Sequence, residues 1–161
     1  HTSAHYTKRT NLTIQQLKTT LLVDTAANAV LDIHVTTTRK HDTQIAPQVV
    51  KRNAASIAVL TGDKGYDDQK LRRLARNHDI RPLIKHREFT PLHKAWNARL
   101  DNDLDHRRTM NETVNAAIKQ KFGAFVRSRL WWKQFRELVI KCVVHNLERG
   151  IAISHAEGEC S

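Results

Sequence analysis

The stretch Ser56–Asp67, with the sequence SIAVLTGDKGYD, decides the fold. Its first half is short and apolar, a pattern typical of a strand that is buried on both faces of a sheet. Gly62 and Gly65 flank Asp63, so the strand is expected to end there in a tight turn. Ligands of open α/β sheets bind beyond the carboxyl ends of the strands. Asp63 is therefore a candidate ligand-binding residue, and a turn aspartate that caps the next helix is the alternative.

Strand and helix patterns alternate around this stretch. Residues 16–24 and 29–37 are rich in apolar and β-branched residues, and their short link predicts an antiparallel hairpin. A further strand is predicted at 80–84, and helices are predicted at 42–53, 67–78, 107–122 and 132–153. This order predicts an α/β fold with a mixed sheet flanked by helices.

The length of 161 residues fits a single domain, 1–161, that buries a sizeable core. Within it, the polar segment 86–105 is expected to be an insertion or linker with one or two helical turns, and 155–161 a frayed tail. The chain begins at His1 and its single methionine is Met110. We therefore expect it to be an N-terminally truncated piece of a longer protein.

The net charge of +11 predicts an anionic partner, of which nucleic acid is the commonest. A membrane surface fits less well, because the basic residues are spread along the whole chain. No segment is apolar enough to cross a bilayer or to serve as a signal peptide. Cys142 and Cys160 form no CxxC pair, which argues against a structural zinc site and a disulfide framework. A reduced, cytoplasmic setting is expected.

The helix predicted at 107–122 carries the second candidate acid, Glu112. At about 100° per residue, Arg108, Glu112 and Lys119 fall within roughly 40° of one another. The opposite face is apolar and contains Met110, Val114, Ala117 and Ile118. One interpretation is a solvated face with an Arg108–Glu112 ion pair, worth a few tenths of a kcal/mol. The other interpretation is that Glu112 holds a divalent metal ion while the side chains of Arg108 and Lys119 contact DNA phosphates.

Three motifs resemble the transposases of bacterial and archaeal insertion sequences that carry a DDE acid triad. The spacing R-x3-E-x6-K (Arg108, Glu112, Lys119) is similar to their C-terminal signature, which has a tyrosine where this chain has Asp105. The segment TGDKGYD, Thr61–Asp67, resembles their second-aspartate motif, and Lys40–His41–Asp42 is a further similarity. The resemblance covers nearly the whole chain and is closest to elements of haloarchaeal type.

This resemblance implies an RNase H-like fold whose first strand is missing or incomplete here. It implies that Asp63 and Glu112 are catalytic metal ligands and that Arg108, Lys119 and Lys64 bind DNA. Two Mg²⁺ or Mn²⁺ ions would be the cofactors, and hard carboxylate oxygens suit such ions. The implied reaction is phosphodiester hydrolysis and strand transfer at transposon ends, by an enzyme that acts at the nucleoid and can form a homodimer on DNA.

The first acid of the triad is expected ahead of the residues present here. Asp24 and Asp32 are the acids on the early strands, and neither is assigned as the missing ligand. The isolated chain is therefore expected to be inactive or severely impaired in Mg²⁺-dependent nicking.

Two alternative functions remain open from the sequence. One is another RNase H-like nuclease, and the other is a basic nucleic-acid-binding module whose acids are ordinary surface residues. Carboxylates of Asp63 and Glu112 that approach to about 4–8 Å would favour an enzyme. Among weaker signals, Trp131, Trp132 and Phe135 suggest core packing or a docking edge, and a basic helical set suggests phosphate contact or a solvated face (Lys70, Arg72, Arg73, Arg76).

Overall fold

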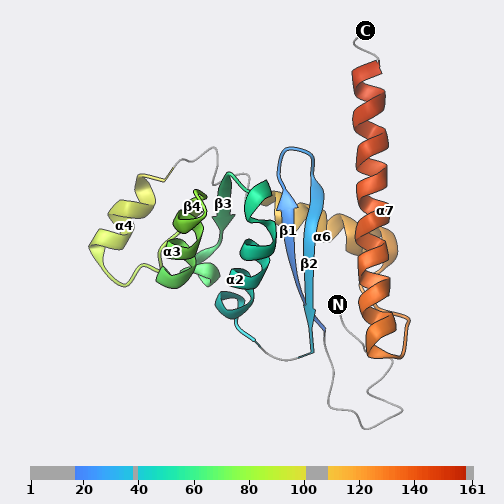
Figure 1. Ribbon diagram of the computed structural model, residues 1–161, viewed down its shortest axis with the longest axis horizontal. Coiled ribbons are helices and arrows are strands. Elements are labelled where there is room, and N and C mark those ends of the chain that lie inside the picture. The colour runs from blue at the N-terminus through green and yellow to red at the C-terminus, as the bar shows by residue number, and fades with distance from the viewer. Residues whose placement is uncertain (1–16, 38–39, 101–108, 159–161) are drawn as a thin grey trace. The chain divides into compact units, whose positions relative to one another are not determined.

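The computed structural model describes residues 17–37, 40–100 and 109–158 (Figure 1). These residues divide into two compact units. The hairpin unit comprises the described residues before 40 and after 110, and the central unit comprises those of the range 40–110. No helix within the described part of the chain is long and apolar enough to cross a membrane.

The hairpin unit begins with two antiparallel strands, β1 (Lys18–Asp24) and β2 (Ala29–Thr36), as the alternating pattern predicted. The register pairs Leu21 with Ile33 and is interrupted by an irregularity between Leu22 and Val23. The turn between the strands ends at Asn28, which has a φ of 54°, a conformation that asparagine adopts more readily than most residues.

Two helices complete the hairpin unit. Helix α6 (Thr109–Phe122) buries Val114 and Ile118 and ends at Gly123, whose φ of 79° is typical of a helix C-terminus. Helix α7 (Trp131–Gly158) runs alongside β2 (Figure 1). The apolar side chains of this unit form two clusters, made of Leu17, Val35, Val126 and Leu138, and of Val30, Val114, Ile118 and Cys142.

Polar side chains of α7 bind the main chain at the start of β2. Asn146 accepts a hydrogen bond from the Val30 N–H and donates one to the Val30 carbonyl, both at 2.8 Å. The ring of His145 contacts the Asn28 carbonyl at 2.9 Å. The Asn146 amide thus takes the place of a neighbouring strand, because it satisfies both main-chain groups of Val30 on the edge of the hairpin.

The central unit is built from α2 (Asp42–Asn53), a 3₁₀ turn η1 (Ala54–Ser56), β3 (Val59–Gly62), a second 3₁₀ turn η2 (Lys64–Tyr66), α3 (Gln69–Asn77), β4 (Arg81–Ile84) and α4 (Pro91–Ala98). Strands β3 and β4 pair in parallel, with Gly62 opposite Ile84. The core of the unit contains Ala46, Val50, Leu71, Ala75, Ile80 and Ile84. Both α2 and α3 thus contribute buried side chains to this core.

The sheet differs from the single mixed sheet that the sequence predicted. The described residues form two separate two-stranded sheets, β1–β2 and β3–β4. Strand β3 begins at Val59, later than expected, because Ala54–Ser56 forms the turn η1. Its residues Val59–Thr61 are only partly buried, and Gly62 alone is fully buried. Apolar runs identify strands, but the pairing between strands depends on contacts that local patterns do not specify.

The solvent exposure of α6 and α7 also differs from expectation. Ala117, placed on the apolar face of α6, is exposed. Trp131, Trp132 and Phe135 are exposed by 46%, 49% and 40%, so core packing is wrong for these side chains. Helix α7 continues to Gly158, past the point at which the tail was expected to fray. Asp105, which stands where the resembled signature has a tyrosine, lies outside the described residues.

Candidate active site

Asp63 lies directly after β3, at the carboxyl end of the parallel pair, as predicted. The residue is exposed, and its Oδ1 accepts a hydrogen bond of 2.7 Å from the Gly65 N–H. Its carbonyl accepts from the Tyr66 N–H at 3.0 Å. The aspartate therefore caps the short turn η2, while the next α-helix, α3, is capped by Asp68. None of the described residues binds the second carboxylate oxygen of Asp63. One oxygen fixes the side chain and the other stays available.

Gly65 lies so close to Asp63 that a side chain at residue 65 would push the Asp63 carboxylate out of its place. A Cβ atom at residue 65 would lie 2.8 Å from Asp63 Oδ1, closer than real Cβ contacts. The constraint on this glycine is one of space and not of backbone conformation, because an added side chain would displace the Asp63 carboxylate. The glycine allows the main-chain N–H to reach the carboxylate and to set its orientation.

The residue four positions further on, Asp67, is committed to internal contacts. Its Oδ1 accepts from Arg72 Nη2 at 2.9 Å and from Arg72 Nε at 3.3 Å, while Oδ2 accepts from the Arg87 N–H at 2.9 Å. The Arg72 and Asp67 side chains are 5% and 15% exposed. Burial alone would raise the pKa of Asp67, but the hydrogen bonds from Arg87 and Arg72 outweigh it and hold the pKa below the ordinary value.

The segment after β4 binds the same turn from the other side. Arg87 Nε donates to the Lys64 carbonyl at 3.1 Å, and Lys64 Nζ contacts Glu88 Oε1 at 2.7 Å. Asn97 of α4 holds this segment in place, because its side chain accepts from the His86 N–H at 2.8 Å and donates to the His86 carbonyl at 3.0 Å. The turn that carries Asp63 is thus tied, through residues 86–88, to α4.

Aromatic rings pack around His86. Its ring stacks on His93 with centroids 5.5 Å apart, and Trp96 lies 5.3 Å away. Burial and the nearby Arg72 guanidinium lower the pKa of His86, although the Asp67 carboxylate opposes this effect. The imidazole is therefore neutral at neutral pH, and its 3.3 Å contact with Asp67 is not an ion pair there.

The surroundings of Tyr66 determine whether its hydroxyl keeps its proton. Burial raises the pKa of Tyr66 to about 12, and the charges of Asp42 and Asp63 add to the effect. The Tyr66 hydroxyl is therefore protonated at neutral pH and is no general base.

His41 is the N-cap residue of α2 but makes no side-chain capping bond, and Asp42 begins the helix. The two residues thus lie at the start of α2.

Glu112 and Lys119 lie on α6 in the hairpin unit. Glu112 is exposed and belongs to the first turn of the helix, and Lys119 is half-buried near its end. Arg108 lies outside the described residues, so the expected Arg108–Glu112 pair lies outside them too. Asp63 belongs to the central unit. The two candidate acids are therefore held by different units, each by its own local structure.

The donor chemistry fits a hard divalent cation only in part. Exposed carboxylates such as Asp63 and Glu112 are the ligands that Mg²⁺ and Mn²⁺ prefer. Within the described residues, however, no group of three or more histidine, cysteine or acidic side chains is placed to hold a metal ion. Asp67 adds nothing to the set, because both of its oxygens are already bound.

The network around Arg72 was not predicted from the sequence. This arginine was grouped with Lys70, Arg73 and Arg76 as a basic helical face, and those three residues are indeed exposed. Arg72 is instead 4% exposed and bound to Asp67 and to the Ile84 carbonyl. Its place beside Ala75 on the helix circumference, at the border of the buried face, was the available signal.

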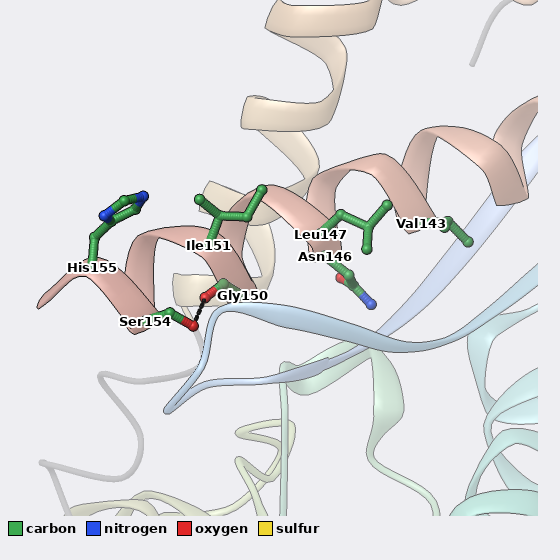
Figure 2. Close-up of a pocket in the computed structure, with 7 residues that line it drawn as sticks. All are labelled: Val143, Asn146, Leu147, Gly150, Ile151, Ser154 and His155. Atoms are coloured by element: carbon green, nitrogen blue, oxygen red, sulfur yellow. Dashed lines mark hydrogen bonds between the residues drawn. The ribbon is translucent and has the colours of Figure 1, made fainter. Parts of the chain in front are cut away.

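A shallow groove runs along α7 in the hairpin unit (Figure 2). It is lined by residues of this helix alone, namely Val143, Asn146, Leu147, Gly150, Ile151, Ser154 and His155. Its lining includes no carboxylate, so it offers no ligand set for a hard cation. We regard it as an apolar surface and not as a catalytic site.

Comparison with known proteins identifies the family. Residues 1–147, which include Asp63, Glu112 and Lys119, match the family described as transposase DDE domain. No curated protein and no solved structure matches the chain significantly. The match covers well over half of the chain and agrees with the motifs at Thr61–Asp67 and at Glu112. The chain therefore belongs to the DDE-domain transposases.

Proposed function

We propose that this chain supplies two acids of a transposase active site, Asp63 and Glu112, which hold divalent cations against a DNA backbone. The observation that carries the proposal is the geometry of Asp63, whose exposed carboxylate has one oxygen anchored by Gly65 and one left available. A ligand that is rigid at its root and open at its tip needs little reorganisation to bind a metal ion.

The reaction we propose is phosphodiester hydrolysis and strand transfer at the ends of an insertion element. Bound Mg²⁺ or Mn²⁺ would activate the attacking water or 3′-hydroxyl and stabilise the leaving oxygen. The role of the chain is to hold the two carboxylates, keep Tyr66 protonated and steady the turn η2. An RNase H-like arrangement of the sheet is part of this proposal.

Cationic side chains would hold the DNA phosphates. We assign this role to Lys64, Lys119 and Arg108. Lys64 is next to Asp63 in sequence, and its pair with Glu88 has side chains that are 50% and 42% exposed. Such exposed pairs contribute little stability, so a phosphate can replace the Glu88 carboxylate at small cost. The net charge of +11 supports binding to DNA, and the nucleoid is the expected place of action.

We also propose that a homodimer forms on DNA. The support is the stripe of exposed apolar side chains on α7, where Ile140, Val143, Leu147 and Ile151 are 60%, 50%, 62% and 59% exposed. Their spacing places them on one face of the helix. A self-complementary face of this kind suits a symmetric contact between two copies.

Manganese binding by the chain itself tests whether the two acids share metal ions. Mn²⁺ is added to the isotope-labelled chain, and paramagnetic broadening of amide signals is followed in the wild type, Asp63→Asn and Glu112→Gln. We expect broadening near both residues in the wild type and its loss at both positions in either variant, because a shared ion needs both ligands.

The control is Asp32→Asn, which removes an acid of β2 that the proposal does not use. It should leave the broadening unchanged. Broadening that persists in Asp63→Asn and Glu112→Gln would refute the shared site and favour a basic nucleic-acid-binding module.

A further inference from the structure

We propose that Asp67 is a positioning residue for Asp63: its carboxylate ties the turn η2 to α3 and to the segment after β4, and thereby fixes the direction in which Asp63 leaves β3. The inference rests on the proposed role of Asp63 as a metal ligand. It assigns to the second aspartate of the GDKGYD stretch a task that differs from metal binding.

The turn η2 packs against the core through Tyr66, but it has few hydrogen bonds of its own. It is a single 3₁₀ turn whose main-chain hydrogen bonds, from Tyr66 to Asp63 and from Asp67 to Lys64, measure 3.0 and 3.4 Å. Bonds of this i→i+3 type have poorer geometry than those of an α-helix. Asp63 and Lys64 are both exposed, so packing does not hold them either. Besides the Gly65 N–H bond to Asp63 and the packing of Tyr66 against the core, contacts from outside the turn are therefore needed to fix the direction of Asp63.

Asp67 is built to supply that restraint. Its two oxygens face different partners, the Arg72 guanidinium of α3 and the Arg87 N–H after β4. Arg72 is fixed in turn by the Ile84 carbonyl at 2.7 Å. Charge-assisted bonds of this kind are shorter and stronger than neutral ones. The Asp67 carboxylate therefore joins the end of η2 to α3 and to the segment after β4.

Arg87 holds the turn at a second point. Its main-chain N–H binds Asp67 and its Nε binds the carbonyl of Lys64, the residue that follows Asp63. The two contacts grip η2 at its two ends. Asn97 of α4 binds both main-chain groups of His86, the residue before Arg87. The position of Arg87 is therefore itself restrained by α4. A continuous set of contacts thus leads from α4 to the root of Asp63.

An ion pair that served only the stability of the fold would not need these contacts. Buried pairs often contribute no more stability than apolar residues of similar size. Two of the contacts made here reach the main chain of η2 or of residue 87, where they restrain the backbone. The inference can therefore be separated from general stabilisation by measuring the motion of the turn alone.

The test is ¹⁵N relaxation on the metal-free chain, with Asp67→Asn as the first variant. An amide offers one acceptor oxygen, so it cannot serve both Arg72 and the Arg87 N–H. We expect order parameters of residues 63–66 to fall from about 0.85 in the wild type to below about 0.6, while those of α2 and α3 stay at rigid values. The matched control is Asp68→Asn, because asparagine caps a helix as well as aspartate does and Asp68 caps α3.

A second variant keeps the inference testable if Asp67→Asn fails to fold. Arg87→Ala removes the bond to the Lys64 carbonyl and keeps the main-chain N–H that binds Asp67. It should loosen residues 63–66 to a smaller degree, with an unchanged Tm. The inference is overturned if the turn stays rigid in Arg87→Ala and, provided that Asp67→Asn folds, in Asp67→Asn as well. A lower Tm of Asp67→Asn does not change this conclusion.

Manganese broadening separates this inference from the proposed function. In Asp67→Asn, the Mn²⁺ concentration needed to broaden the Gly65 amide should rise about tenfold, because the ligand is no longer held in place. Unchanged manganese binding by Asp67→Asn alongside its loss in Asp63→Asn would overturn the positioning role and leave the proposed function intact. Unchanged binding by Asp63→Asn would remove the proposed function, and the relaxation data would still decide whether Asp67 orders the turn.

Discussion

Asp63 and Asp67 carry the same functional group four residues apart, yet their surroundings give them different tasks. Asp63 is exposed and uses one oxygen to bind the Gly65 N–H. Asp67 is mostly buried and uses both oxygens, one for Arg72 and one for Arg87. We propose Asp63, and not Asp67, as a metal ligand because only Asp63 has a carboxylate oxygen that none of the described residues binds.

Gly65→Ala tests the residue-scale geometry of Asp63. The new methyl group would meet Asp63 Oδ1 at 2.8 Å, and the short aspartate side chain can turn away to relieve the contact. We expect the free energy of unfolding to change by less than about 0.5 kcal/mol. The concentration of Mn²⁺ needed to broaden nearby amides should rise several-fold, since the carboxylate is displaced.

The matched control is Gly150→Ala, at a glycine inside α7 where an added Cβ meets nothing within 4 Å. Alanine is the better helix former, so this variant should gain about 0.5–1 kcal/mol of stability. Its manganese binding should match the wild type. A Gly65→Ala chain that binds manganese normally would show that the Gly65 contact does not orient Asp63.

At the scale of elements, side chains that bind main-chain groups of a neighbouring segment recur in both units. Asn97 binds both main-chain groups of His86, and Asn146 does the same for Val30. Glu137 of α7 accepts from the Arg127 and Ser128 N–H groups. Lys141 donates to the Phe125 carbonyl. These contacts attach the main chain of these segments to the helices beside them.

Asn146→Asp tests the attachment of α7 to the hairpin. The variant keeps an acceptor for the Val30 N–H but turns a second oxygen toward the Val30 carbonyl, which loses its donor. We expect a loss of about 1–3 kcal/mol in a urea unfolding experiment, the cost of an unsatisfied and partly buried group. Glu148→Gln, which breaks the exposed pair with Lys121, should cost less than about 1 kcal/mol. Equal losses in the two variants would contradict the proposed attachment.

The pKa values of Asp67 and His86 predict how the stability of the central unit depends on pH. The pKa values of Asp67 and His86 are both lowered in the folded protein, so the unfolded chain binds more protons as the pH falls. The stabilising contribution of His86 is complete above about pH 6.5 and that of Asp67 above about pH 4. Each contribution is lost as the pH falls through the lower folded-state pKa.

Urea midpoints measured from pH 7 downward check this expectation. Stability should decrease toward acid, and Asp67→Asn should flatten the steep part of the curve below about pH 4, because it lacks the titrating group. Asp68→Asn should keep that steep part. A curve for Asp67→Asn that runs parallel to the wild type would exclude the linkage.

At the scale of the whole molecule, the exposed apolar stripe of α7 is the surface that suits a partner. Leu147→Glu places a charge in the middle of the stripe. Because Leu147 is 62% exposed, its replacement should change the stability of the monomer little. We expect sedimentation experiments with a short DNA duplex to show a dimer for the wild type and a monomer for the variant. Ala152→Glu adds the same charge to another side of the helix and should remain dimeric. A wild type that stays monomeric on DNA at all concentrations would refute the proposed homodimer.

The sequence by itself determined the elements and the position of Asp63. Periodic patterns predicted the hairpin, the helices α2, α3, α6 and α7, and the end of β3 at Gly62, because neighbouring residues alone fix such structure. The motifs around Asp63 and Glu112 pointed to the family that residues 1–147 match. These predictions depend on local chemistry, which a linear pattern records.

Only the tertiary structure decided how the strands pair and what each charged side chain contacts. The buried Arg72, the two bound oxygens of Asp67 and the exposed stripe on α7 all follow from segments that lie apart in the sequence. Desolvation makes a buried charge costly unless its partners are in place, and those partners come from α3, from the residues after β4 and from α4. A pattern of residue types contains the charges, but folding selects their partners.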